Sequence, residues 1–204
     1  MRDASALPTM TVGEYLRFEE SSQVKHEYVA GEVYAMSGGT SRHNLIAGTI
    51  FRLLLGAEQS PCRVYISDMR IDAASDRYYY PDVVVVCTPI AELDSVARGP
   101  CVVVEVTSPI SARVDRGEKL DAYRRIPALR AYLVVDHRRR RVERHWRDSS
   151  TGEWTREEIV GAAQTPIPVP RLDVSLTLDG IYRRVDLPAV HERESWESEL
   201  EDEG

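Results

Sequence analysis

Two valine-rich runs constrain the fold of this chain more than any other part of it. One spans residues 83–86 and the other residues 102–106, and both are almost continuously β-branched or apolar. Such runs are typical of strands that are buried on both faces of a sheet. A sheet of that kind needs other elements packed against it, so the runs predict a domain in which helices flank a central sheet.

Each run carries one carboxylate, Asp82 just before the first and Glu105 near the end of the second. If the two strands are antiparallel neighbours, these side chains lie at the same edge of the sheet and converge. A buried, ionised carboxylate without a partner is costly. Taken singly, Asp82 could bind backbone N–H groups and Glu105 could pair with an arginine. Taken together, they make a divalent metal ion the first partner to test.

The remaining elements follow from periodicity, capping and turn signals. Thr11 and Glu14 form a capping box for the first helix, and Asp115 with Glu118 is predicted to cap a later one. The expected elements are a helix over 12–20, a hairpin over 25–36, a helix over 41–56, a strand over 61–71, the two valine strands, a helix over 115–125, a strand over 131–136, edge strands over 142–146 and 154–160, a rigid loop over 166–170 and a short helix over 176–182. This order predicts one α+β domain over residues 1–190, with a mixed central sheet and an αβββαβ core.

The net charge of −7 is unevenly distributed. Residues 191–204 hold seven acidic residues and one basic residue, which predicts a disordered acidic tail. Residues 113–147 hold twelve basic residues and five acidic ones. This basic region is compatible with a phosphate-backbone partner, although the same arginines could simply solvate a helix and a hairpin.

Several other classes of protein find no support in the sequence. No apolar run approaches the length of a membrane helix, and the first residues lack the apolar core of a secretory signal, so a cytoplasmic location without membrane contact is expected. The three cysteines, Cys62, Cys87 and Cys101, show no CxxC spacing. They are predicted to be small buried thiols in a reducing compartment, and a zinc site is not supported.

Asp82 and Glu105 suit a hard cation. Mg²⁺ and Mn²⁺ prefer oxygen ligands, and the backbone carbonyl of Val106 is a candidate third donor. Such a metal polarises a phosphate and lowers the pKa of a bound water. Lys119 is the leading candidate for stabilising the developing charge, because its helix directly follows the Glu105 strand.

Four further side chains are candidates for the same site. Glu27, on the first hairpin, could take an accessory acidic role, as could Glu32 on the return strand. His43 lies in the first turn of its helix and could orient a phosphate or a water. Tyr123 is four residues from Lys119 and shares its face, although core packing would also explain it.

Two sets of motifs carry a resemblance to known proteins. Pro81-Asp82 followed by Glu105-Val106-Thr107 and a helix resembles the PD-(D/E)xK nuclease superfamily. The segments over residues 27–34, 80–85, 104–109 and 115–124 also resemble the Uma family of restriction-endonuclease-like proteins. The resemblance covers about residues 10 to 185. It implies a Mg²⁺-dependent DNA endonuclease that hydrolyses phosphodiester bonds through a metal-activated water, with DNA as partner and often a homodimer.

One position departs from the superfamily pattern. Thr107 stands two residues after Glu105, where the superfamily has a lysine, and the Uma-like pattern supplies that lysine from the following helix as Lys119. A metal-dependent endonuclease is therefore the leading hypothesis. The alternatives are a catalytically inactive nucleic-acid-binding or scaffold protein on a nuclease fold, and a protein-interaction partner that uses the acidic tail.

Overall fold

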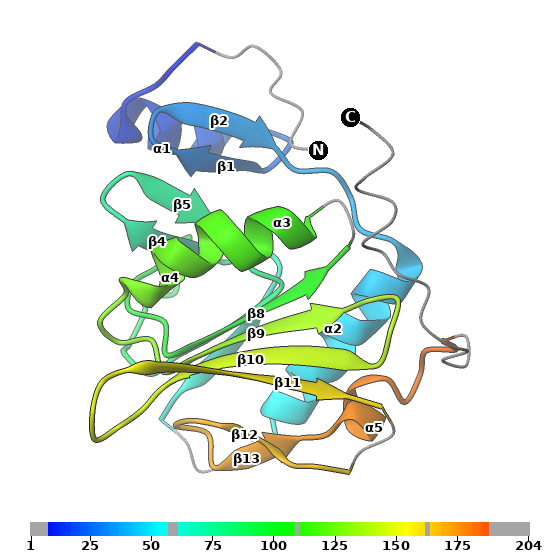
Figure 1. The fold of residues 1–204 in the computed structure, drawn as a ribbon. Helices are drawn as coiled ribbons and strands as arrows, with labels where there is room; N and C mark the ends of the chain where they lie inside the picture. The colour runs from blue at the N-terminus through cyan, green and yellow to red at the C-terminus, as the bar shows by residue number, and fades with distance from the viewer. Residues whose placement is uncertain (1–7, 57–60, 109–110, 162–163, 188–204) are drawn as a thin grey trace, which may run out of the picture.

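The computed structural model describes residues 8–56, 61–108, 111–161 and 164–187, which fold into two larger sheets and a small one (Figure 1). The six-stranded sheet has the order β11 (Trp154–Val160), β10 (Arg141–Arg147), β9 (Ala131–Asp136), β8 (Val102–Thr107), β6 (Val83–Val86) and β3 (Arg63–Ile66). The five-stranded sheet has the order β2 (Glu32–Ala35), β1 (His26–Val29), β5 (Arg77–Tyr79), β4 (Arg70–Ala74) and β7 (Val96–Ala97). The small sheet pairs β12 (Ile167–Val169) with β13 (Val174–Leu176). The helices are α1 (Val12–Ser21), α2 (Ser41–Leu54), α3 (Ala112–Val114), the π-helical turn η1 (Asp115–Lys119), α4 (Leu120–Arg124) and α5 (Leu178–Ile181).

The two valine runs form the centre of the six-stranded sheet, as predicted. Strands β6 and β8 pair antiparallel, with Val83 opposite Val104, and β8 pairs parallel with β9. Strand β9 continues through an antiparallel hairpin of β10 and β11. The predicted α+β class with a mixed sheet is confirmed.

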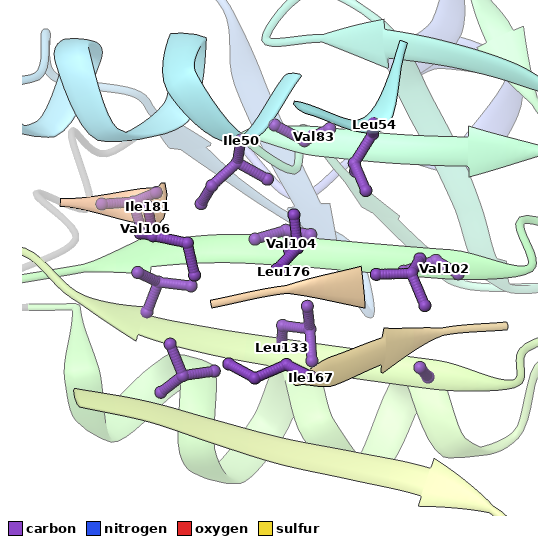
Figure 2. Packing of buried hydrophobic residues seen from close by; sticks show 14 of the residues in the cluster. Ile50, Leu54, Val83, Val102, Val104, Val106, Leu133, Ile167, Leu176 and Ile181 are labelled. Atoms are coloured by element: carbon purple, nitrogen blue, oxygen red, sulfur yellow. The ribbon is translucent and has the colours of Figure 1, made fainter. Parts of the chain in front are cut away.

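Alternating side chains of this sheet pack into two separate cores. Val83, Val85 and Val104 point to the side of α2, α5 and the small sheet (Figure 2). Val84 and Val103 point the other way, toward α4 and strands β4 and β5. Figure 1 shows α3 and α4 lying between the two larger sheets. This sandwiched layer is where the candidate site lies.

The N-terminal elements form as the local signals indicate. Thr11 and Glu14 make the capping box of α1. The β1–β2 hairpin turns through Ala30 and Gly31, whose φ angles are 49° and 100°. Two successive positive φ angles are characteristic of the tight hairpin turns whose twist matches that of the flanking strands.

The segment over residues 61–71 is not one strand, and that prediction was wrong. It divides into β3 and β4, which belong to different sheets. The division falls at Ser67, which has a φ of 56° and donates its N–H to the carbonyl of Asp82 at 2.9 Å. A residue with left-handed backbone angles turns the chain out of the first sheet, so the two halves of the segment belong to different sheets. Residues 166–170, expected to be a rigid loop, contain strand β12.

The cap predicted at Asp115 was also wrong. The chain is already helical from Ala112, so the Asp115 N–H donates within the helix to the carbonyl of Ser111 at 2.9 Å. From Asp115 to Lys119 the helix widens into a π-helical turn before α4 continues it. Such turns are rare and are frequently found at functional sites.

The cysteines meet at one end of the sheet. Cys62 and Cys87 form a disulfide, which corrects the prediction of three separate thiols, whereas Cys101 is a buried free thiol as expected. Among the described residues no helix is long and apolar enough to cross a membrane. The predicted acidic tail over residues 191–204 lies outside the described residues.

Candidate active site

The predicted pair of carboxylates does converge. Asp82 directly precedes β6 and Glu105 lies on the neighbouring β8, and the register places them side by side on the face that carries Val84 and Val103. Asp82 Oδ2 accepts the backbone N–H of Val106 at 2.7 Å. Glu105 is buried, with 5% of its surface exposed. The period of two along a strand is what directs both side chains into the layer between the sheets.

Lys119 lies at the centre of this layer and is buried. Its Nζ lies 3.0 Å from Glu105 Oε1, 2.8 Å from Glu27 Oε1 and 3.6 Å from Asp115 Oδ1. A lysine from the helix therefore reaches Glu105. In the superfamily pattern the lysine beside this glutamate lies on the strand itself. Lys119 is therefore a buried member of the cluster and not a solvated surface lysine.

Tyr123 belongs to the core and to the cluster at once. Its side chain is fully buried and stacks edge-on against Tyr79 and Tyr132. Its hydroxyl donates to Glu105 Oε1 at 2.8 Å. Tyr79 completes this wall by donating to Glu118 Oε1 at 2.9 Å. The aromatic rings thus fix the helix against the strand and hold the Glu105 carboxylate in place.

His43 approaches the site from the other side of Asp82. The side chain of Thr40 caps α2 by accepting the N–H of His43 at 3.2 Å, and the imidazole Nε2 lies 3.2 Å from Asp82 Oδ2. Burial lowers the pKa of His43, but the hydrogen bond and charge of Asp82, with the carbonyl of Val106, outweigh it and raise the pKa above its usual value. The imidazole contacts two of the three predicted metal donors.

The cluster contains more negative charge than its own cations balance. Burial raises the pKa of Glu105, and although the Lys119 ammonium opposes this, Asp115, Asp82 and Glu27 add to it. For Lys119 the burial penalty is outweighed by the same carboxylates, which raise its pKa. Lys119 therefore stays protonated, and one lysine faces three buried carboxylates.

Six of the predicted side chains come together in this layer, namely Glu27, His43, Asp82, Glu105, Lys119 and Tyr123. Glu32, the other acidic candidate, is exposed and accepts a hydrogen bond from Tyr34, away from the cluster. Asp115 was missed as a site residue because it resembled a helix cap, although its spacing of four from Lys119 was a visible signal. Thr107 is buried, and its hydroxyl donates to the carbonyl of Ser108 at 3.2 Å.

The donor set fits a hard divalent cation. The protein contacts described above engage Asp82 Oδ2 and Glu105 Oε1, so each carboxylate has a second oxygen for another ligand. Oxygen donors with surplus negative charge are the environment that Mg²⁺ and Mn²⁺ prefer. The residues that would hold such an ion are Asp82, Glu105 and the carbonyl of Val106.

Together the mixed sheet, the helix that crosses it and the acidic cluster with a buried lysine define a restriction-endonuclease-like α+β domain. A crystal structure described as "a putative nuclease belonging to DUF820", from Anabaena variabilis, has the same fold, with a TM-score of 0.71 over 85% of this chain and 98% of that one, at 15% identity.

Sequence comparison places the chain more closely. Residues 12–179 match the Uma2 family model, described as "Putative restriction endonuclease", and the chain belongs to that family. Two uncharacterized proteins of Synechocystis sp. are similar to it. One is 33% identical over 74% of this chain and 88% of its own length, and the other 31% identical over 88% of this chain and 95% of its own length.

Proposed function

We propose that this protein is a Mg²⁺-dependent endonuclease that hydrolyses phosphodiester bonds in DNA, with Mn²⁺ as a substitute. The observation that carries the proposal is the position of Lys119, 3.0 Å from Glu105 on β8, beside Asp82 from the paired strand β6. This arrangement supplies the acidic pair and the cation that phosphodiester hydrolysis requires, and the family and the fold both support a nuclease.

Each residue of the cluster has a definite role in this proposal. Asp82, Glu105 and the carbonyl of Val106 hold the cation, which when bound would polarise the scissile phosphate and acidify a water. Lys119 offers a fixed positive charge to the developing anion. Glu27 and Asp115 hold Lys119 in place, and both are positioning residues.

His43 and Tyr123 act from opposite sides of the cluster in the same proposal. The imidazole of His43 lies beside Asp82 at the more exposed end, where it can donate to a phosphate oxygen or exchange a proton with water. The hydroxyl of Tyr123 holds Glu105 Oε1, and so fixes the direction of its other oxygen.

The partner proposed is DNA. Exposed arginines of the protein form a cationic edge to which the phosphate backbone could bind. Exposed arginines lie at the ends of the elements that surround Asp82 and Thr107, at the start of α2 (Arg42), in α3 (Arg113) and after β9 (Arg138). The charges of Arg42 and Arg138 both act on His137, whose N–H donates to the carbonyl of Thr107 at 3.2 Å. Clustered arginines of this kind attract phosphate backbones.

Part of the basic region between residues 113 and 147 forms ion pairs within the protein. Arg116 and Arg141 pair with Glu143 of their own chain, and Arg140 pairs with Asp179. The proposed DNA contact therefore rests on the exposed arginines and not on the total charge. A homodimer, which the resemblance implies, is also part of the proposal, and light scattering after size-exclusion chromatography measures it.

The test is cleavage of supercoiled plasmid and of branched DNA with Mg²⁺ or Mn²⁺. The wild type is expected to nick or linearise the DNA, and Asp82→Asn is expected to leave it intact. Asp121→Asn is the matched control. Asp121 lies on α4, the helix that follows Lys119, but it is an exposed carboxylate outside the cluster. Equal activity of wild type and Asp82→Asn would contradict the proposal.

The inactive nucleic-acid-binding alternative predicts a different pair of results. It expects salt-dependent DNA binding with no cleavage under any divalent cation, and no saturable metal binding. The position of Thr107, where the superfamily has a lysine, is the observation in its favour.

A further inference from the structure

The second cluster of chemically active side chains lies at the other end of the same strands. Cys62 directly precedes β3, Cys87 directly follows β6 and Cys101 directly precedes β8. Because β6 runs antiparallel to both neighbours, its end meets the starts of β3 and β8. The acidic cluster therefore lies at one end of β6 and β8, and the cysteines at the other.

The register brings all three sulfurs together. Arg63 pairs with Val86, which puts Cys62 opposite Cys87, and the N–H of Cys101 donates to the carbonyl of Val85 at 2.8 Å. The three Sγ atoms all lie within 4.8 Å of one another, and those of Cys87 and Cys101 are 3.0 Å apart. Three adjacent strands thus fix three sulfurs in one place, without any CxxC motif.

The cluster is accessible from the side of Cys62. Cys101 is buried, with 4% of its surface exposed, whereas Cys62 and Cys87 are half-buried. A pocket of about 330 Å³ reaches Cys62 between the end of α2 and strand β3. Its walls are otherwise mostly apolar and include Leu54 and Leu172. A small solute can therefore reach the sulfurs from the Cys62 side.

Cationic groups lie near the cluster. The charges of Arg171 and Arg130 both act on Cys101 and favour its thiolate, although burial outweighs them and raises the pKa of the thiol to about 11. The carbonyl of Arg171 lies 3.8 Å from Cys62 Sγ. Two arginines would compensate the negative charge of a complex that contains three thiolates.

We propose that Cys62, Cys87 and Cys101 form a redox-gated site for a thiophilic metal ion such as Zn²⁺, Cd²⁺ or Cu⁺. In the first step a dithiol transfers two electrons and two protons to the Cys62–Cys87 disulfide, which opens to two thiols while the dithiol closes to a disulfide. In the second step one metal ion binds the three sulfurs, and the three thiols release their protons to solvent. The oxidised protein lacks the site because two of its donors are bonded to each other.

The third cysteine is what distinguishes this site from a plain structural disulfide. A covalent link between β3 and β6 requires only Cys62 and Cys87, and gives no reason for a third sulfur at 3.0 Å. Thiolates are the ligands that select soft and borderline metals, and three of them make the core of a high-affinity site. This inference is independent of the proposed endonuclease activity.

The test uses the full-length protein and Cd²⁺ alone as the probe. The protein is reduced with dithiothreitol, desalted without oxygen and titrated with Cd²⁺, and the near-ultraviolet sulfur-to-cadmium absorption is recorded. One equivalent is expected to saturate the reduced protein, and the oxidised protein is expected to show no band. Protein loaded with Zn²⁺ beforehand should develop the same band when Cd²⁺ is added, because thiolates bind the softer ion more tightly.

The cysteine variants decide between three ligands and two. Cys101→Ser and Cys101→Ala are both measured, since the buried site could tolerate only one of them, and circular dichroism confirms that each folds. Each is expected to weaken Cd²⁺ binding at least about tenfold, as are Cys62→Ser and Cys87→Ser. A reduced wild type without a saturable band would overturn the proposal, as would wild-type affinity in a folded Cys101 variant.

Discussion

Two buried glutamates of the six-stranded sheet, Glu143 and Glu105, have very different charged neighbours. Glu143 on β10 receives hydrogen bonds from Arg116 at 3.1 Å, Arg156 at 3.0 Å and His145 at 2.7 Å. Glu105 on β8 has Lys119 at 3.0 Å, but that lysine is shared with two more carboxylates. One glutamate is surrounded by cations and the other lies in an excess of anions.

The two pKa values express this difference. Burial would raise the pKa of Glu143, but the hydrogen bonds from His145 and Arg156 outweigh it and hold the pKa far below its usual value. Burial raises the pKa of Glu105, and its neighbouring carboxylates add to the rise beyond what Lys119 offsets. This contrast is what the proposed binding of a divalent cation at Glu105 rests on. The following predictions test that contrast, from the largest effect to the smallest.

Removing a carboxylate of the candidate site should abolish activity without unfolding the protein. Asp82→Asn and Glu105→Gln are each expected to lower plasmid cleavage on the order of a thousandfold, about 4 kcal/mol of transition-state stabilisation. Neither change leaves a buried charge unpaired, so the midpoint of urea unfolding should fall little. Cleavage that persists in both variants would show that the excess of negative charge has no catalytic use.

Removing the lysine should damage stability as well as activity. Lys119→Met leaves Glu27, Glu105 and Asp115 buried without their shared cation, which is expected to cost about 3 kcal/mol in the free energy of unfolding. The loss should shrink as the pH falls and the carboxylates take up protons. Urea unfolding measures both effects. If the protein is as stable with methionine as with lysine, the ion pairs of the cluster contribute nothing to the free energy of unfolding.

A second substitution separates the loss of stability in Lys119→Met from its loss of activity. Glu27→Gln combined with Lys119→Met removes one of the buried charges that shared the lysine and should recover part of the stability, with no recovery of cleavage. Arg125→Met is the matched control, because Arg125 is an exposed cation at the end of the same helix.

Glu143 should behave in the opposite sense to the site carboxylates. Because its folded pKa is lowered, it contributes stability that is present above its unfolded pKa of about 4.3 and is lost as the pH falls toward the folded value. Glu143→Gln is expected to cost about 2 kcal/mol at neutral pH, and the difference from wild type should shrink below about pH 4. Thermal unfolding across that range measures it. A difference that does not change with pH would mean that packing alone explains the variant.

The smallest effect expected is that of the tyrosine hydroxyl. Tyr123→Phe keeps the ring packing against Tyr79 and Tyr132 but removes the donor to Glu105. Stability should fall by about 1 kcal/mol, the value of one hydrogen bond. If the hydroxyl also positions Glu105, the loss of transition-state stabilisation calculated from the cleavage rates should exceed the loss in the free energy of unfolding. Unchanged cleavage would limit Tyr123 to a role in the core.

The convergence of the acidic pair could be predicted because it depends on local rules. Asp82 and Glu105 sit at the start and the end of two buried strands, and the period of two fixes their common face once the strands pair antiparallel. Lys119 followed from the helix that comes next in the chain. These inferences required short-range pattern and one assumption about pairing.

What could not be predicted depends on contacts between distant segments. Nothing local shows that Ser67 turns the chain into a second sheet, since any residue with a short polar side chain can adopt that conformation. The meeting of the three cysteines depends on the register of three strands, and the partners of Glu143 come from a helix and a neighbouring strand. Asp115 was misassigned because the helix begins one turn earlier than its capping signal suggests.

The central claim is that the acidic cluster binds a divalent cation, and calorimetric titration with Mn²⁺ tests it most directly. The wild type should show one saturable site per chain, and Glu105→Gln should show none, while Glu143→Gln binds as the wild type does at neutral pH. A wild type that binds no Mn²⁺, or a Glu105→Gln variant that binds it equally well, would contradict the account.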